Sequence, residues 1–286
     1  MRLVMTLLVR DEQDVLADHL DVHYSLGVDF VVATDNLSED ATPDILQHYA
    51  DEGRLAWRRE TDDDYAQAKW VTRMAREAAT EHGADWILNS DADEFWWPAR
   101  GTLPEFFAAL PDDVGGVKVP RDNFVPVHEE DDRPFHQRMT VREVGSRNDR
   151  GKRILPKVAH RADPGVVVGQ GNHRIESDVL GPVVAAEGLE ILHFPMRSYR
   201  QFENKIVKGG RAYGQHPERD RYGRIWQRLY ERYLAGELEE YYASTIPSTK
   251  ELDQGLREER YREDTRLRDH LAALRDGPGP GGRSGP

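Results

Sequence analysis

Three carboxylates stand close together after an apolar run in the stretch DWILNSDADEFWW, residues 85–97. Asp91 and Asp93 flank a single alanine, and Glu94 follows directly. In an extended segment residues i and i+2 point the same way, so both aspartates could face one cation, directly or through water. Hard oxygen ligands of this kind suit Mg²⁺ or Mn²⁺. The alternative is that the two aspartates only cap a following turn.

A second candidate is Asp35, in the stretch TDNLSEDAT at residues 34–42. A carboxylate at the end of a strand could accept hydrogen bonds from a nucleotide base or a ribose. The neighbouring Ser38, Asp40 and Thr42 are residue types that turn a chain and cap a helix. We therefore expect a binding role for Asp35 and a structural role for the other three.

Two histidines and a basic run later in the chain could also do chemistry. His193 follows the apolar run 189–192 and could be a metal ligand or a hydrogen-bonded core residue. His173, in GQGNHRI, could contact a phosphate or an acceptor, or could be an ordinary exposed loop histidine. Lys205, Lys208 and Arg211 recur at helical spacing, so they could neutralise a diphosphate or simply solvate a helix face.

The elements that must position these residues alternate between two periodicities in the first 120 residues. Apolar runs predict strands at 2–9, 29–35, 54–60 and 85–91. Helical spacing predicts helices at 15–24, 41–53 and 65–82. This alternation implies βαβ units in a mainly parallel sheet, in which ligands bind beyond the carboxyl ends of the strands. That rule selects the carboxylate-rich loops 9–12, 34–42 and 90–94.

The rest of the chain has a different pattern. Between about 114 and 195, short apolar runs broken by Gly, Pro and charge predict antiparallel strands and long loops. Helical periodicity returns at 199–236, and residues 249–274 have the composition of a solvated helix with a narrow apolar stripe.

Composition limits the classes of function. The chain has 286 residues, of which 38% are hydrophobic, so it is globular. Its net charge of −13 provides no positive field for a nucleic acid partner. No apolar run approaches the roughly 18 residues of a membrane span, and the N-terminus has no small-residue cleavage site, so we expect a cytoplasmic protein. The absence of Cys excludes disulfides, thiolate metal sites and a Cys nucleophile.

Several motifs in order resemble the family 2 glycosyltransferases, in the branch that opens with (N/D)E...HH..LG...DN.S.D.T. They are VRDEQDVLADHLDVHYSLGVDFVVATDNLSEDATPDIL, QAKW, DWILNSDADEFW and ILHFPMRSYRQFENKIVKGG, within about residues 1–210. The resemblance implies a GT-A fold: a mainly parallel, Rossmann-like α/β sheet flanked by helices, with a mixed or antiparallel second half and C-terminal helices. It also implies a nucleoside-diphosphate sugar donor, a divalent metal at the DxD motif and usually inversion at the anomeric carbon.

The resemblance also assigns donor-binding positions. It implies that Val9, Arg10 and Glu12 meet the nucleotide and that Asp35 reads the base or ribose. Lys69, in QAKW, matches a donor-contacting basic residue. Asp91 and His173 complete the donor-binding candidates. Asp11 stands where the branch commonly has Asn.

The resemblance indicates metal ligands, whereas the catalytic base has several candidates. Asp91 and Asp93 match the motif that holds Mn²⁺ or Mg²⁺, and His193 resembles a late histidine that can complete the metal sphere. Inverting transfer needs a base for the acceptor hydroxyl. Glu94 and Asp122 are the predicted catalytic residues, and Glu143 is a further candidate.

We expect residues 1–215 to form the catalytic domain, with a nucleotide-binding half at 1–120 and an acceptor half at 121–215. A helical extension is predicted at 216–274 and a disordered tail at 275–286. The acceptor is a glycan or small molecule that the sequence does not identify, and the oligomeric state stays open. Two alternatives are a nucleotidyltransferase, which would need a Gly- and Lys/Arg-rich phosphate loop after the first strand, and a non-catalytic carbohydrate-binding protein on the same fold.

Overall fold

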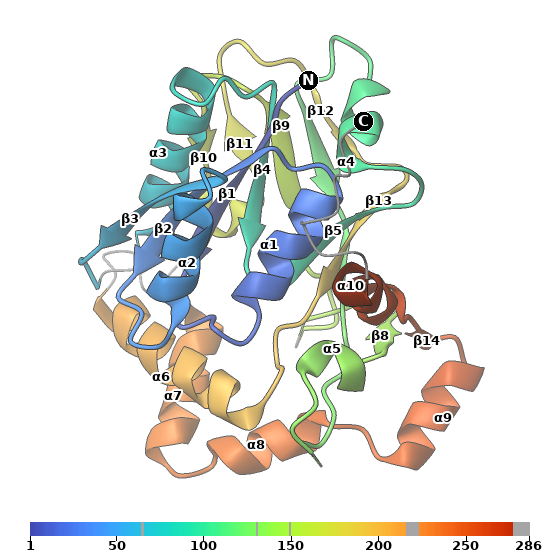
Figure 1. Cartoon of the computed structure of the whole chain (residues 1–286). Helices are drawn as coiled ribbons and strands as arrows, with labels where there is room; N and C mark the ends of the chain where they lie inside the picture. Colours follow the sequence, from blue (N-terminus) through green and yellow to red (C-terminus); the bar gives the residue numbers. More distant parts are fainter. Residues whose placement is uncertain (64–65, 130, 149, 216–222, 277–286) are drawn as a thin grey trace.

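The computed structural model describes residues 1–63, 66–129, 131–148, 150–215 and 223–276 (Figure 1). The predicted alternation of strands and helices is present, at nearly the predicted positions, over the first 91 residues. The elements are β1 (Leu3–Val9), α1 (Leu16–Ser25), β2 (Phe30–Asn36), α2 (Thr42–Asp51), β3 (Leu55–Glu60), α3 (Gln67–Thr80) and β4 (Trp86–Asp91).

The four strands β1 to β4 belong to a seven-stranded sheet with the order β12-β6-β9-β4-β1-β2-β3. β1 pairs in parallel with β2 and with β4, and β2 pairs in parallel with β3. The other three strands are β6 (Gly116–Val119), β9 (Lys157–Arg161) and β12 (Val183–Ala185). Because β9 runs antiparallel to both β4 and β6, the second half of the sheet is mixed, as predicted.

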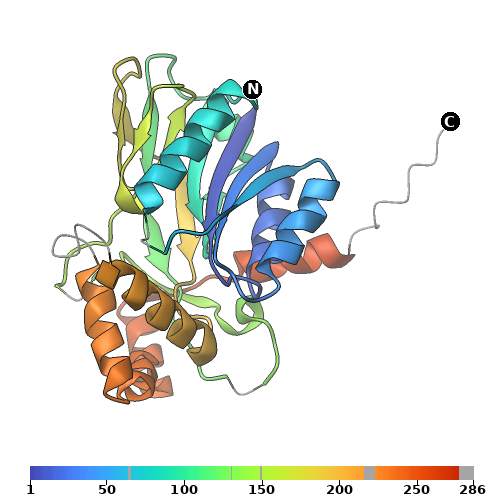
Figure 2. The same cartoon turned by 90° about the vertical axis from the view of Figure 1, so that its left-hand side faces the viewer.

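Helices cover both faces of this sheet because its strands alternate their side chains between two apolar cores. Leu3, Met5 and Leu7 of β1 belong to the core that includes α1 and α2. Val4 packs on the opposite face in a core that includes Met74 of α3. Figures 1 and 2 show α1 and α2 on one side of the sheet and α3 on the other. Because β1 to β4 run in the same direction, their carboxyl ends lie at one shared edge of the sheet.

A second sheet of three strands brings distant segments to that edge. β5 (Glu94–Pro98) and β7 (Arg121–Asn123) lie on either side of β13 (Leu189–His193). β13 runs antiparallel to β5 and parallel to β7. In this register His193 lies opposite Glu94 on one side and Asn123 on the other.

Short elements complete the second half. A hairpin of β10 (Val167–Val168) and β11 (Ile175–Glu176) encloses the 3₁₀ turn η1 (Gln170–Asn172) beside α3. The helices α4 (Leu103–Ala108) and α5 (Phe135–Arg138) are brief, and β8 (Val141–Glu143) pairs with a strand near the end of the chain.

The C-terminal helices are α6 (Tyr199–Gln215), α7 (Arg224–Leu234), α8 (Leu238–Thr245), α9 (Thr249–Arg257) and α10 (Arg266–Asp276). α6, α7 and α8 share an apolar cluster and lie beyond the carboxyl edge of the sheet (Figure 2). The single helix predicted at 249–274 is wrong, because β14 (Tyr261–Glu263) interrupts it and pairs with β8. The Cβ-free Gly255 of α9 packs against the Tyr261 ring, which turns the chain into that strand.

The end of the chain differs slightly from its prediction. α10 continues to Asp276 and packs on α1 and α5, so the first two residues of the predicted tail are helical. Residues 277–286 lie outside the described part of the chain. None of the helices in the described part is both long and apolar enough to cross a membrane.

Candidate active site

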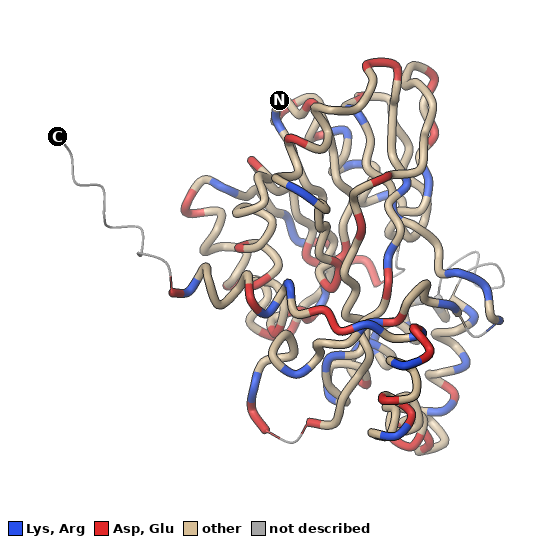
Figure 3. The backbone as a smooth tube through the Cα atoms, turned by 90° about the vertical axis from the view of Figure 1, so that its right-hand side faces the viewer, with Lys and Arg blue, Asp and Glu red and all other residues tan. Residues whose placement is uncertain are grey.

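A cavity of about 440 Å³ opens where β1 and β4 end, between the sheet and the helices α6, α7 and α8. The sheet side contributes residues of all three predicted loops, with Asn36 coming from the stretch 34–42. The helical side contributes charged residues of α6 and the apolar side chains Trp226 and Tyr241. Acidic and basic residues are interspersed along the backbone (Figure 3), and both kinds line this cavity.

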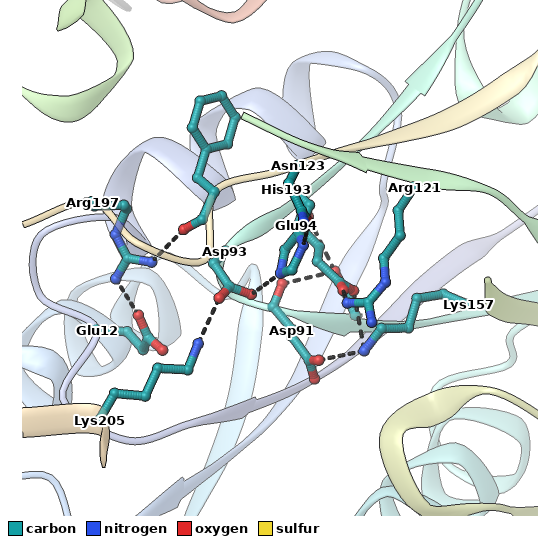
Figure 4. A network of polar contacts seen from close by, with 12 residues as sticks. Glu12, Asp91, Asp93, Glu94, Arg121, Asn123, Lys157, His193, Arg197 and Lys205 are labelled. Carbon is teal, nitrogen blue, oxygen red and sulfur yellow. Dashed lines mark hydrogen bonds and ion pairs between the residues drawn. The ribbon is translucent and has the colours of Figure 1, made fainter. Parts of the chain in front are cut away.

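Three side chains at the cavity form a group that could hold a metal ion. One ligand atom from each of Asp93, Glu94 and His193 lies within 4.8 Å of the other two. The His193 Nε2 atom faces Asp93 Oδ1 at 3.7 Å (Figure 4). The pairing of β13 with β5 creates this proximity, because His193 lies opposite Glu94 and the Phe194 amide donates to the Asp93 carbonyl at 2.9 Å.

The tautomer of His193 is set by Asn123 of β7. The Nδ1 atom of His193 lies 2.7 Å from Asn123 Oδ1, and an amide oxygen can only accept, so Nδ1 carries the proton. Burial, with a smaller contribution from Arg121, lowers the pKa of His193 despite the nearby Asp93 carboxylate. A neutral ring with this tautomer presents the lone pair of Nε2 to Asp93. A histidine held through its other nitrogen in this way is typical of metal ligands.

The group fits a hard divalent cation. Two ligand atoms that are each about 2.1 Å from one Mg²⁺ ion can be separated by up to about 4.2 Å, so the 3.7 Å between Nε2 and Oδ1 can be bridged. Glu94 is completely buried, and its Oε2 atom has no hydrogen-bond partner in the described part of the chain. Neutral imidazole and carboxylate oxygens together suit Mn²⁺ as well as Mg²⁺.

Asp91 lies outside this group. The extended segment predicted for residues 91–93 is wrong, because β4 ends at Asp91 and a turn follows at Ala92 and Asp93. Asp91 instead binds the buried Lys157 of β9 and accepts from Asn172 Nδ2 at 3.2 Å. It still lines the cavity and keeps about a third of its side chain exposed.

Asp93 and Glu94 also have cationic partners. Lys205 of α6 donates from Nζ to Asp93 Oδ2 at 2.7 Å. Burial raises the pKa of Asp93, but Lys205 and His193 more than offset it, so this pKa lies well below its usual value. Glu94 accepts from Arg121 Nη1 at 2.5 Å, and its Oε2 lies 3.3 Å from Lys157 Nζ.

A buried arginine, Arg197, binds carboxylates of the loop after β1. Arg197 donates from Nη2 to Glu12 Oε2 at 2.5 Å and from Nε to Asp14 Oδ2 at 2.7 Å. Only 1% of the Arg197 side chain is exposed, and these carboxylates raise its pKa even though burial acts to lower it. Burial also raises the pKa of Glu12 to about 7, against the opposing effect of Arg197.

The other predicted donor-binding residues are placed in two ways. Val9, Arg10 and Glu12 line the cavity, as the resemblance implied. Asp35 does not line it: the carboxylate is fully buried, accepts from the Ser38 amide at 3.2 Å and faces Arg59 at 3.6 Å.

Lys69 and His173 also lie away from the cavity lining. Lys69 lies in a separate groove along α3, whereas Gln67, two residues earlier on the same helix, lines the cavity. His173 bonds through Nδ1 to the Pro156 carbonyl at 2.8 Å, and burial lowers its pKa to about 4.

The candidate bases on the acceptor side are likewise engaged in protein contacts. Asp122 accepts from the Ser146 amide at 2.9 Å and does not line the cavity. The adjacent residues of β7, Arg121 and Asn123, point to the opposite side of the strand from Asp122, so Asn123 reaches His193. Glu143 lies 3.5 Å from Asn123 Nδ2, and burial raises its pKa.

Sequence patterns alone assign no role to four residues that shape the site, namely Arg121, Asn123, Lys157 and Arg197. Arg121 and Asn123 stand in the PRDNF stretch, where only the intervening Asp122 was considered. Lys157 could have been noticed as a lysine that opens the apolar run KVAH. Arg197 lies within a motif that carries the resemblance, yet its partners Glu12 and Asp14 come from the other end of the chain.

Two solved structures to which the chain is similar are distant from it in sequence. TarS 1–349 from S. aureus in complex with UDP is 14% identical, with 75% of this chain and 70% of that chain covered and a TM-score of 0.44. The mannosyltransferase PcManGT from Pyrobaculum calidifontis, in complex with GDP-Man and Mn²⁺, is 16% identical, with 75% and 62% covered and a TM-score of 0.39. No curated protein matches the sequence.

The comparison with protein families identifies the chain. Residues 5–226 match glycosyltransferase family 92, and this range includes most of the sheet, α6 and all of the cavity-lining residues except Leu229 and Tyr241. The prediction of a GT-A-type glycosyltransferase is thereby confirmed, whereas the number of the family is 92 and the motifs had pointed to family 2. The nucleotidyltransferase alternative is excluded by the same match. This chain belongs to glycosyltransferase family 92.

Proposed function

We propose that this glycosyltransferase moves a sugar from a nucleoside-diphosphate donor to an acceptor hydroxyl, with the help of a divalent metal and with inversion. The observation that supports it most directly is the pair of Asp93 and His193, in which a neutral Nε2 faces a carboxylate oxygen at 3.7 Å. The pair lies at the carboxyl edge of a mainly parallel sheet, where ligands of such sheets bind.

Asp93 and His193 would hold Mn²⁺ or Mg²⁺, with Glu94 as the third member of the group. When bound, the ion offsets negative charge on the departing diphosphate. The cavity needs that charge, because its lining has four basic residues, Arg10, Arg121, Lys205 and Lys208, and four acidic ones, Asp11, Glu12, Asp91 and Asp93. Without the ion, the lining has no excess of positive charge that would attract a diphosphate.

The protein side chains would position the donor. Val9, Arg10 and Glu12 border the cavity from the loop after β1, and the Arg10 guanidinium is itself held by Asp63 at 2.6 Å. Asn36, the residue after Asp35, faces the cavity at the end of β2 and would take the role predicted for Asp35. The aromatic side chains of Trp226 and Tyr241 form the far wall, which we assign to the acceptor, a glycan or a small molecule.

We propose the predicted division of labour between segments of the chain. Residues 1–120 would bind the nucleotide and residues 121–215 would serve the acceptor, to which α7 and α8 of the C-terminal extension would add Trp226 and Tyr241. Both halves reach the metal group, because Asp93 comes from the first and His193 from the second. Glu94 would support this group and not take the acceptor proton, since it is fully buried and paired with Arg121 and Lys157.

The test is nucleotide binding with and without metal. Calorimetric titration of UDP and of GDP should give binding with Mn²⁺ and little binding with EDTA, and the Asp93→Asn variant should lose this dependence. A ligand at about 100 times its Kd stabilises a protein by about 2.7 kcal/mol. Because the nucleotide should bind only with Mn²⁺, its addition should raise the melting temperature only when Mn²⁺ is present. The exposed Asp112→Asn serves as the matched control. Equal affinity for both nucleotides in Mn²⁺ and in EDTA would refute the metal dependence.

Turnover tests the rest of the proposal. With a sugar nucleotide and Mn²⁺, the enzyme should release the nucleoside diphosphate. NMR of the transferred sugar should show the anomeric configuration opposite to that of the donor. Retention of the donor configuration would reject inversion while leaving the metal group untouched.

A further inference from the structure

Two lysines of α6 reach across the cavity to carboxylates of the nucleotide-binding loops. Lys205 Nζ lies 2.7 Å from Asp93 Oδ2. Lys208, one turn later on the same helix face, lies 2.6 Å from Asp11 Oδ2 and 2.7 Å from Glu39 Oε2. These contacts attach α6 to the loops after β1, β2 and β4.

The contact of Lys205 is unusual because it uses the carboxylate assigned to the metal. Its ammonium binds Oδ2 of Asp93, while Oδ1 of the same side chain faces the lone pair of His193 (Figure 4). A divalent ion at Oδ1 and an ammonium at Oδ2 would be like charges separated by a single carboxylate, which is unfavourable in a partly buried site.

Lys205 can leave this position without breaking the core. Its side chain is about 30% exposed and lines the cavity, and a lysine ammonium on a four-carbon stem reorients easily. Arg121, by contrast, is also bonded to the Leu155 carbonyl at 3.0 Å and is 15% exposed. Of the two cavity cations paired with the metal group in the described part of the chain, Lys205 is therefore the more free to move.

We propose that Lys205 is a tethered cation that occupies Asp93 in the metal-free enzyme and moves to the donor diphosphate when a divalent ion takes its place. This inference rests on the proposed role of Asp93 in metal binding. It gives α6 a function in ordering the events: the lysine keeps the carboxylate charge compensated beforehand, and it becomes available to the diphosphate only once the ion is present.

The test measures Mn²⁺ affinity of the nucleotide-free protein by calorimetry at low salt. Lys205→Gln removes the competing charge, so Mn²⁺ should bind roughly tenfold more tightly than to the wild type. In saturating Mn²⁺ the same variant should bind UDP or GDP roughly tenfold more weakly. Lys205→Arg keeps the charge and should retain a Mn²⁺ affinity close to that of the wild type.

Lys208→Gln is the matched control, because it removes one charge from the same helix face but from Asp11 and not from Asp93. It should strengthen Mn²⁺ binding much less than Lys205→Gln. Melting curves of all variants without metal verify that each one is folded.

Two results would overturn the inference, and they differ in what else they reject. If the wild type binds Mn²⁺ and Lys205→Gln binds it equally or less well, Lys205 does not compete with the ion, and the proposed function stands. If neither protein binds Mn²⁺ and nucleotide affinity is the same in EDTA, the metal-dependent function fails together with the inference.

Discussion

His193 Nε2 lies 3.7 Å from Asp93 Oδ1, and the two residues reach this position through the pairing of β13 with β5. His193 donates through its other nitrogen to Asn123, so its free lone pair is directed at the aspartate. The pair therefore combines a fixed tautomer with a charged oxygen at a separation that one ion can bridge.

Replacing His193 with Ala should weaken Mn²⁺ binding at least about tenfold, or about 1.4 kcal/mol, because one ligand is lost. The melting temperature of the metal-free protein should change little, since the side chain lies beside the cavity. Titration calorimetry and thermal melting measure the two effects. His48→Ala on α2, whose side chain is 69% exposed, is the control. A lower metal-free melting temperature with unchanged Mn²⁺ affinity would show that His193 is a core residue.

Asn123 should matter through the orientation of His193. The Asn123→Ala variant removes the acceptor for Nδ1–H, and loss of such an outer partner typically lowers metal affinity about 10- to 100-fold. Asn123→Asp keeps an acceptor at the same place, so its Mn²⁺ affinity should stay near the wild-type value. ¹⁵N NMR of the metal-free protein should show the Nδ1–H tautomer of His193 in the wild type and a mixture of tautomers in Asn123→Ala. A single unchanged tautomer in that variant would contradict the assigned role.

Glu94→Gln distinguishes the role of catalytic base, which is predicted from the sequence, from membership of the metal group, which the structure indicates. If Glu94 belongs to the metal group, removing its charge in Glu94→Gln should lower the Mn²⁺ affinity, and kcat should recover substantially at high Mn²⁺. If Glu94 is instead the catalytic base, the substitution should leave the Mn²⁺ affinity unchanged and lower kcat by about 10²- to 10⁴-fold at any Mn²⁺ concentration. We expect the first pattern, because Glu94 is buried and held by Arg121 and Lys157.

Stability should fall in mild acid because of buried neutral histidines such as His160 of β9. Burial lowers its pKa to about 4, whereas the unfolded chain has about 6.5. The unfolded state therefore binds the proton first, and the stabilisation is complete above pH 6.5 and is lost as the pH falls towards 4. At pH 5 the loss from this residue alone should be about 2 kcal/mol.

The variant His160→Leu should lose less unfolding free energy between pH 8 and pH 5 than the wild type does. Urea denaturation at both pH values without metal measures the difference, and the His48→Ala protein, which removes an exposed histidine, provides the reference. Equal losses in wild type and His160→Leu would show that His160 does not titrate as its burial implies.

The sequence by itself determined the order of elements and the edge at which ligands bind. Apolar runs and helical spacing are local properties, so they located β1 to β4 and the three intervening helices at nearly their observed positions. Parallel strands then place their carboxyl ends at one edge, and all three loops selected in this way contribute residues to the cavity lining. The interruption at β14 escaped the same reasoning, because a three-residue strand is created by its partner β8 and not by its own composition.

The tertiary structure alone decided which side chains meet. Adjacent strand residues point to opposite sides, so a difference of one position places Asn36 at the cavity and buries Asp35. A turn in place of an extended segment separates Asp91 from Asp93, and the register of β13 supplies His193. Lys205 comes from a helix beyond the sheet. These relationships depend on backbone direction and on pairing between segments distant in sequence, which local hydrophobic pattern does not encode.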